Sequence, residues 1–254
     1  QLAMFHTFFN CTVVLIMLPL TNKLISIVMK ILPDKHVETV TDDSVPHLYY
    51  VNDLMLRTPA IAVEQVKNEI INMSRLAMEN FRLSYDMIQK MNFDRLEDFK
   101  LNEERIDYLN KEVARFLVKL SNQPLSSSDS IYVSTAYKSL TDLERIGDYA
   151  ENIVEYAVKM KDTGEGFSSV ALEETAKVEQ MVEDLYDKIL IAYTNKDRRS
   201  LEVAYDIEEQ IDVFTDEMAA NHIKRLNDGV CTLDVGAKYL ALASDTERVA
   251  DHLI

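Results

Sequence analysis

The chain has 254 residues, 47% of them apolar, with only 5 glycines and 5 prolines. This length and composition allow a sizeable core, while the scarcity of glycine and proline argues against all-β architectures, whose many turns use both residues. Acidic residues outnumber basic ones 43 to 27, a formal charge of −16. Because such a surface repels a phosphate backbone, we expect no nucleic-acid binding. Two cysteines, Cys11 and Cys231, form no disulfide framework, which indicates a reducing compartment.

The first 22 residues contain no Lys, Arg, Asp or Glu. A transmembrane helix needs about 20 predominantly apolar residues, and the lysines that follow, at positions 23, 30 and 35, match a cytoplasmic flank. We therefore predict a transmembrane helix with an interfacial continuation over residues 1–33; the alternative is a buried core helix. Polar side chains inside a membrane span face other helices or a substrate path, which assigns a transport path to His6, Thr7 and Asn10.

Residues 34–58 have no sustained apolar period and are predicted to form a linker. Pro59 fits the first turn of a helix capped by Thr58. Beyond it the periodicity predicts helices over 60–91, 96–121, 128–160, 170–195, 200–226 and 233–254. Pro124, the segment 163–166 and Gly229 supply the breaks between them.

An internal repeat organises these helices. Residues 103–113 recur as 208–218 at an offset of 105, and residues 142–149 recur as 245–252 at an offset of 103. Apolar residues recur at alternating spacings of three and four along these helices and form the contact lines, or seams, of helical bundles. In the helix over 96–121 the seam residues are Ile106, Leu109, Val113, Phe116 and Leu120. We predict an all-α fold of two three-helix bundles, in a domain over 59–254 with repeats 59–162 and 167–254. Gly147 lies on a seam, where a close helix approach would offset its cost of about 1 kcal/mol.

Four acidic pairs with i, i+4 spacing lie beside the seams: Glu103 with Asp107, Glu144 with Asp148, Glu208 with Asp212, and Glu247 with Asp251. Each pair projects from one helix face, so adjacent helices can bring two pairs together. Converging carboxylates need cations between them, and oxygen ligands suit magnesium, calcium or manganese, with iron also open. The alternative is a solvated acidic face paired with arginines. His222 occupies an apolar position and is predicted to pack rather than to bind metal.

Residues 142–153, Asp-Leu-Glu-Arg-Ile-Gly-Asp-Tyr-Ala-Glu-Asn-Ile, resemble the signature of PhoU proteins, phosphate-signalling regulators built from two three-helix bundles. The second copy, residues 245–254, matches less closely, with Thr246 and Ala250 substituted. The acidic motifs of this family, which are implicated in multinuclear iron or zinc clusters, fall on the four pairs named above. The resemblance therefore implies a metal cluster held by these eight carboxylates.

The segment Phe5-His6-Thr7-Phe8-Phe9-Asn10, followed by Leu18-Pro19, resembles the last membrane segment of bacterial sodium/phosphate cotransporters, many of which carry a cytoplasmic PhoU-like domain. This resemblance implies the C-terminal part of a sodium-dependent phosphate transporter in the inner (plasma) membrane, with residues 34–254 in the cytoplasm. Its partners would be inorganic phosphate, the membrane and sodium as coupling ion, and a homodimer is a further expectation. The repeat pairs Ile254 with Glu151, in mid-helix, so we expect truncation at both ends.

Two other functions stay open. The first is a free-standing PhoU-type regulator that acts on a phosphate importer and a sensor kinase. The second is a metal-dependent enzyme on a helical bundle. The sequence has no Gly-rich phosphate loop, no Ser nucleophile elbow and no Cys-x-x-Cys motif, so we expect no enzymatic activity.

Overall fold

A computed structural model describes residues 6–15, 17, 20 and 46–254. The chain divides into two compact units, residues 1–45 and 46–254. In the first unit residues 6–15 are helical, and apolar side chains such as Phe8 and Leu15 are exposed. No helix of the described residues combines the length and the apolar character that crossing a membrane requires. The predicted span over residues 1–33 falls mostly outside the described residues.

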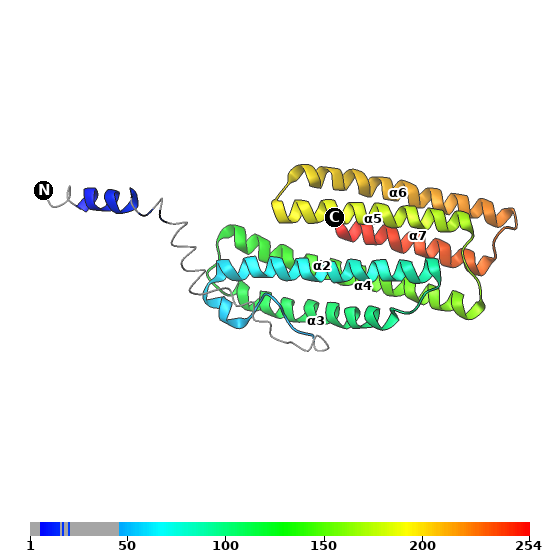
Figure 1. Cartoon of the computed structure of the whole chain (residues 1–254), viewed down its shortest axis with the longest axis horizontal. Helices are drawn as coiled ribbons and strands as arrows, with labels where there is room; N and C mark the ends of the chain where they lie inside the picture. Colours follow the sequence, from blue (N-terminus) through cyan, green and yellow to red (C-terminus); the bar gives the residue numbers. More distant parts are fainter. Residues whose placement is uncertain (1–5, 16, 18–19, 21–45) are drawn as a thin grey trace. The chain divides into compact units, whose positions relative to one another are not determined.

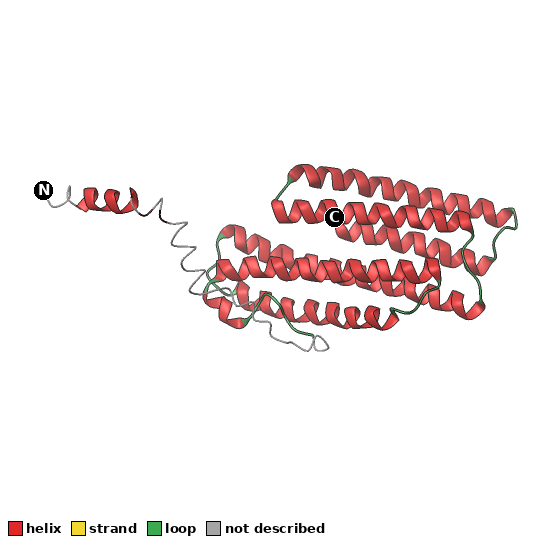
Figure 2. Ribbon diagram, in the orientation of Figure 1, coloured by secondary structure: helices red, strands yellow, loops and turns green. Residues whose placement is uncertain are grey.

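The second unit is helical, as predicted (Figures 1 and 2). Its long helices begin and end within three residues of the predicted bounds. One element was not predicted, the short 3₁₀ helix η1, which lies inside the expected linker. In chain order the elements are η1 Asp53–Arg57, α2 Pro59–Lys90, α3 Leu96–Ser121, α4 Ser127–Thr163, α5 Ser169–Asn195, α6 Arg198–Asn227 and α7 Leu233–Leu253.

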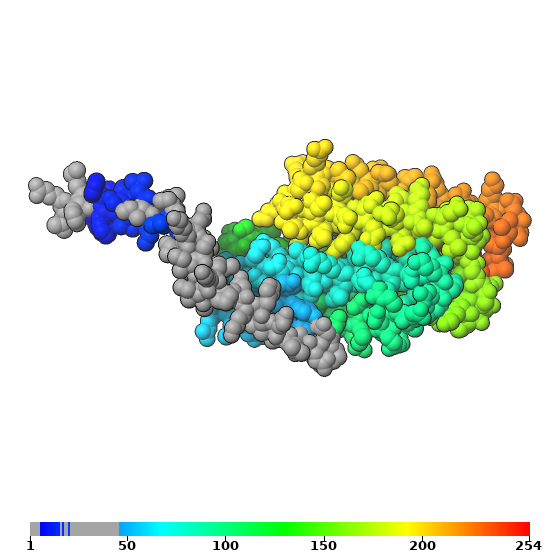
Figure 3. All heavy atoms as spheres, in the orientation of Figure 1, coloured from blue at the N-terminus to red at the C-terminus, as the bar shows by residue number. Residues whose placement is uncertain are grey.

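The helices form two bundles. The first bundle contains α2, α3 and α4, the second contains α5, α6 and α7, and the two meet through the pairs α4–α7 and α2–α5. Within this unit α3 and α6 are the outer helices. Figure 3 shows the second bundle, yellow to orange, packed directly on the first, cyan to green. The arrangement places α3 against α4 and α6 against α7, the two helix pairs that carry the acidic motifs.

Helix ends follow local chemistry. Ser126 caps α4 by accepting a hydrogen bond from the backbone N–H of Asp129 at 3.1 Å, and α4 stops at Gly164, whose φ of 71° is left-handed. Pro59 opens α2 as predicted. Thr58 occupies the N-cap position as predicted, but its hydroxyl donates to the carbonyl of Met55 at 3.3 Å and caps no helical N–H.

The predicted seams form the core. Ile106, Leu109, Val113, Phe116 and Leu120 of α3 are all buried, and their burial supplies the main stabilisation of the bundle. The close approach expected on α4 is also present, but at a side chain rather than a helix backbone. A Cβ added at Gly147 would lie 3.2 Å from Oε1 of Glu103.

The chain enters the second unit through a buried carboxylate. Glu69 of α2 is fully buried, and its Oε2 accepts a hydrogen bond from the backbone N–H of Tyr50 at 2.7 Å. The next residue, Val51, is also buried. Burial raises the pKa of Glu69, and hydrogen bonds from the backbone of the entering segment oppose that rise. The segment before η1 is therefore fixed to α2.

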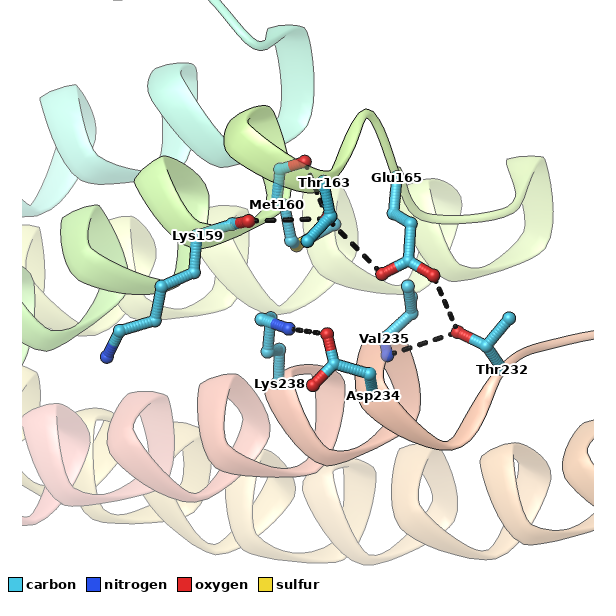
Figure 4. A network of polar contacts seen from close by, with 8 residues as sticks. All are labelled: Lys159, Met160, Thr163, Glu165, Thr232, Asp234, Val235 and Lys238. Carbon is cyan, nitrogen blue, oxygen red and sulfur yellow. Dashed lines mark hydrogen bonds and ion pairs between the residues drawn. The ribbon is translucent and has the colours of Figure 1, made fainter.

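The connection between the bundles is fixed in a similar way (Figure 4). Glu165, just after α4, accepts hydrogen bonds from the hydroxyls of Thr163 at 3.4 Å and Thr232 at 3.1 Å. Thr232 in turn caps α7 by accepting from the backbone N–H of Val235 at 3.3 Å. The end of α4 is thereby tied to the beginning of α7.

Candidate metal centre

Three carboxylates converge in the second repeat. One carboxylate oxygen from each of Glu208, Asp212 and Asp251 lies within 4.8 Å of the others. Glu208 and Asp212 come from α6, beside the buried Ile211, and Asp251 comes from α7, beside the buried Ala250. The apolar seams thus turn α6 and α7 so that the acidic edges face each other. Oxygen atoms at this spacing can ligate one cation together.

The electrostatics of this cluster favour a cation. Burial, followed by the charges of neighbouring carboxylates, raises the pKa of Glu208, Asp212 and Glu247. Oδ1 of Asp212 is buried and has no hydrogen-bond partner, although a buried oxygen normally finds one. A bound cation would satisfy this atom and remove the repulsion. The residues therefore fit a metal ligated by oxygen.

Glu247, the fourth predicted ligand of this repeat, lies near the cluster but outside the set of three. Burial raises the pKa of Glu247, and the charges of Asp212 and Asp251 raise it further. Glu247 therefore interacts electrostatically with two members of the cluster. Arg248 opposes this rise only as the last of the contributing groups. Pairing with arginine is thus a minor effect here.

The first repeat arranges its four carboxylates differently. Within the described part of the chain, the Glu208, Asp212 and Asp251 group is the one with three donors this close together. In the first repeat the pKa of Glu103 is raised to about 7, first by burial and then by the charges of Asp107 and others. The pKa values of Glu144 and Asp148 are raised as well, by burial and by Asp107. The four groups interact, but Glu103 is turned inward.

Asn80 of α2 explains the inward turn. Its amide donates to the backbone carbonyl of Phe99 and to Oε2 of Glu103, both at 3.1 Å, and Gly147 leaves room for that carboxylate. Oδ1 of Asn80 is itself buried without a partner. Sequence reasoning missed Asn80. A comparison of the two repeats could have indicated that their acidic sites differ, because the second repeat has Ala250 where the first has Gly147.

The remaining predicted residues are placed as follows. His222 is packed, as predicted: it is 3% exposed, and its ring lies 5.2 Å from that of Tyr239. His6, Thr7 and Asn10 are exposed in the first unit, and their role in a transport path stays a prediction.

Comparisons with known proteins agree with the repeat structure. The model of the PhoU domain family matches residues 70–157 and 175–254, that is, both bundles. Three relatives carry the name phosphate-specific transport system accessory protein PhoU homolog. The one from Xylella fastidiosa (strain 9a5c) is 20% identical over 193 residues, covering 75% of this chain and 79% of the relative.

The second relative, homolog 1 of Thermotoga maritima, is 22% identical over 214 residues, covering 82% of this chain and 85% of the relative. The third, from Aquifex aeolicus, is 29% identical over 102 residues, covering 39% of this chain and 46% of the relative. The family match begins at residue 70, and none of these relatives bears the name of a sodium/phosphate cotransporter, so that prediction receives no support. With both of its bundles matched, the chain belongs to the PhoU domain family.

Proposed function

We propose that the chain is a PhoU-type regulator of phosphate transport, which acts by binding components of a transport system and not as an enzyme. The observation that carries the proposal is the family match across both bundles, together with relatives named as accessory proteins of a phosphate-specific transport system. These observations favour the regulator over the sodium-dependent transporter. The regulator would influence phosphate flux by contacting transporter states with different affinity.

The test is phosphate uptake in a bacterium that lacks its own PhoU protein. Expression of the chain should change the rate of labelled phosphate uptake toward that of the parent strain. A variant carrying Glu208→Gln, Asp212→Asn and Asp251→Asn should lose the effect, while the control Glu202→Gln with Asp206→Asn, an acidic pair on the exposed face of α6, should keep it. Stable expression of the chain without any change in uptake would contradict the proposal.

The acidic cluster of the second repeat is proposed to hold a metal ion. Glu208, Asp212 and Asp251 would be its ligands, with Glu247 beside them, and the orphaned Oδ1 of Asp212 supports this assignment. Glu103, Asp107, Glu144 and Asp148 form the corresponding proposed site of the first repeat. Iron and zinc are the leading candidates; magnesium, calcium and manganese also suit the donor set.

Metal content separates this proposal from the regulator proposal. Elemental analysis after purification without chelators should find metal in the natural chain and in the Glu202→Gln/Asp206→Asn control. The triple variant of the second cluster should contain less metal per chain, because it has lost the site of the second repeat, with its helical circular dichroism unchanged. Equal metal content in all three proteins would show that these carboxylates are not the ligands.

Attachment to a membrane by residues 1–33 rests on the sequence, because the first 22 residues carry no Lys, Arg, Asp or Glu. The proposal places residues 34–254 on the cytoplasmic side of the inner membrane. Alkaline extraction of membranes should leave the full chain in the membrane pellet and release a chain that starts at residue 34. Release of both proteins would contradict the proposed membrane attachment and, with it, the transporter alternative.

A further inference from the structure

Asn80 is a polar side chain in the core of the first bundle. It is fully buried on α2, which packs against both α3 and α4 (Figure 1). Its amide nitrogen donates two hydrogen bonds of 3.1 Å, one to the carbonyl of Phe99 and one to Oε2 of Glu103. The amide oxygen Oδ1 is buried and has no hydrogen-bond partner. Because a buried polar atom without a partner costs stability, a purely structural role explains Asn80 poorly.

The second repeat lacks the amide. At the repeat offset of 105, Leu185 takes the place of Asn80, and α5 contains no Asn or Gln between positions 180 and 195. Glu208 is the counterpart of Glu103 at the same offset. Burial and then neighbouring carboxylates raise the pKa of Glu208, and no hydrogen bond opposes them. Glu208 therefore accepts no counterpart of the bond that Asn80 donates to Glu103.

The spacing of the carboxylates differs accordingly. In the second repeat one oxygen from each of three carboxylates lies within 4.8 Å of the others. The three residues are Glu208, Asp212 and Asp251, and their counterparts are Glu103, Asp107 and Asp148. In the part of the chain that the structure describes, the counterparts do not reach this spacing. Where it lies now, the Glu103 carboxylate is bonded to α2 instead of grouped with the other two.

Gly147 provides the room for this position of Glu103. A Cβ added at Gly147 would lie 3.2 Å from Oε1 and 3.3 Å from Oε2 of Glu103, closer than an ordinary van der Waals contact. The second repeat has such a Cβ, because Ala250 takes the place of Gly147. Two residues on two different helices thus act together: Asn80 on α2 attracts the carboxylate, and Gly147 on α4 admits it.

We propose that Asn80 is a positioning residue that withholds Glu103 from the metal site of the first repeat, so that the second repeat binds metal first. This inference rests on the metal sites proposed above. An ion entering the first repeat has to draw Glu103 away from the amide, and its apparent affinity falls by the fraction of molecules in which Glu103 is available. A hydrogen bond to a charged group corresponds to about a tenfold preference or more.

Occupancy of the first site also changes α2. Once an ion holds Glu103, the amide nitrogen of Asn80 keeps Phe99 as its one acceptor. The side-chain amide of Asn80 therefore reports whether the first site is filled, although Asn80 does not ligate the ion.

The experiment titrates the full chain, freed of metal by a chelator, with Zn²⁺ at pH 8, above the pKa of about 7 of Glu103. Calorimetry should resolve a stronger and a weaker binding step, and Glu208→Gln should remove the stronger one. In ¹⁵N-labelled protein the side-chain amide signal of Asn80, assigned by its absence in Asn80→Leu, should shift with the weaker step only. This signal follows the hydrogen bond itself.

Two variants should strengthen the weaker step and leave the stronger step unchanged. Asn80→Leu keeps the size of the side chain and removes the amide, so the first site should bind Zn²⁺ about tenfold more tightly. Gly147→Ala keeps the amide but crowds the inward carboxylate, so it should act in the same direction. The matched control is Ala250→Gly, which should change neither step, because α5 offers Glu208 no amide.

Three results would count against the inference. A weaker step of equal affinity in the natural chain, Asn80→Leu and Gly147→Ala would overturn it alone and leave the metal sites standing. A shift of the Asn80 signal with the stronger step would also overturn it, because the first repeat would then bind metal first. The absence of both steps from the natural chain would overturn the proposed metal sites together with the inference.

Discussion

Glu103 and Glu208 are repeat-equivalent residues in different surroundings. Glu103 is hydrogen-bonded by Asn80 and turned toward Gly147, whereas Glu208 stays with Asp212 and Asp251 at the edge of α6 and α7. The lack of a Cβ at Gly147 and the buried amide of Asn80 account for the difference between the two sites. The two bundles thus present unlike acidic sites despite their shared motif.

The partly buried carboxyl of Glu103 should make stability depend on pH. Its pKa is raised to about 7 from an ordinary value of 4.5. A carboxyl whose pKa is raised by folding contributes stability below pH 4.5, and this contribution is lost as pH rises through 7. In chelator-treated protein Glu103→Gln should remove that loss. After allowance for solvent screening, we expect the variant to be more stable at pH 8 by about 1–2 kcal/mol.

Urea unfolding between pH 4.5 and 8 measures this effect. The control Glu104→Gln, on the exposed face of α3, should keep the slope of the natural chain. An unchanged slope in Glu103→Gln would mean that this carboxyl does not titrate in the buried position.

Gly236 illustrates a second close approach. A Cβ at this position would lie 2.3 Å from Nε2 of His222, which is packed and 3% exposed. Gly236→Ala should therefore destabilise the chain by about 1–3 kcal/mol through overpacking. In a His222→Ala background the same change should cost little, as should Gly166→Ala, where a Cβ meets nothing within 4 Å. Chemical denaturation of the four variants gives the coupling; equal costs in both backgrounds would refute the contact.

Among the elements, the helices were predictable and the 3₁₀ helix was not. Long apolar periods specify α2 to α7, and the seam of α3 was predicted residue by residue. By contrast, η1 is five residues long, and none of them is buried; its position depends on contacts with α2 and α3, which no local pattern contains. The acidic pairs were predictable from spacing, but which of them converge depends on Asn80, a residue of another helix.

Two helices end at left-handed residues that are not glycine. Met91 ends α2 with φ 52°, and Lys196 ends α5 with φ 54°. Because a Cβ is strained in this region, Lys196→Gly should stabilise the chain by up to about 1 kcal/mol. Asn122, which ends α3 in the right-handed region, is the matched control, since Asn122→Gly should be neutral or destabilising there. The midpoints of thermal unfolding of both variants test this prediction. A lower midpoint for Lys196→Gly than for the natural chain would contradict the strain argument.

At the scale of the whole molecule, the two bundles of residues 46–254 share one core. Buried residues of all six long helices form a single cluster, and pairs such as Arg82 with Glu183, Nε to Oε1 at 2.8 Å, join the bundles at the surface. The sequence predicted two bundles through the repeat. It could not predict how they meet, because the contacts between α4 and α7 join residues about a hundred positions apart.

A shared core predicts one unfolding transition for both bundles. Leu117→Ala in the first bundle and Leu185→Ala in the second, both at fully buried positions, should each cost about 2–5 kcal/mol and shift the same transition. The chain has 12 tyrosines and no tryptophan, so far-ultraviolet circular dichroism and tyrosine absorbance are suitable probes. Two separated transitions, each sensitive to only one variant, would show independent bundles.

The anchoring of Tyr50 by Glu69 has a mechanical consequence. Tension applied to the chain before residue 46 first meets a hydrogen bond to the fully buried Glu69 of α2, and only afterwards η1. A pull or twist from upstream is therefore delivered to the inner helix α2, which contacts both α4 and α5. This route carries a load from the leading segment into both halves of the helical domain at once.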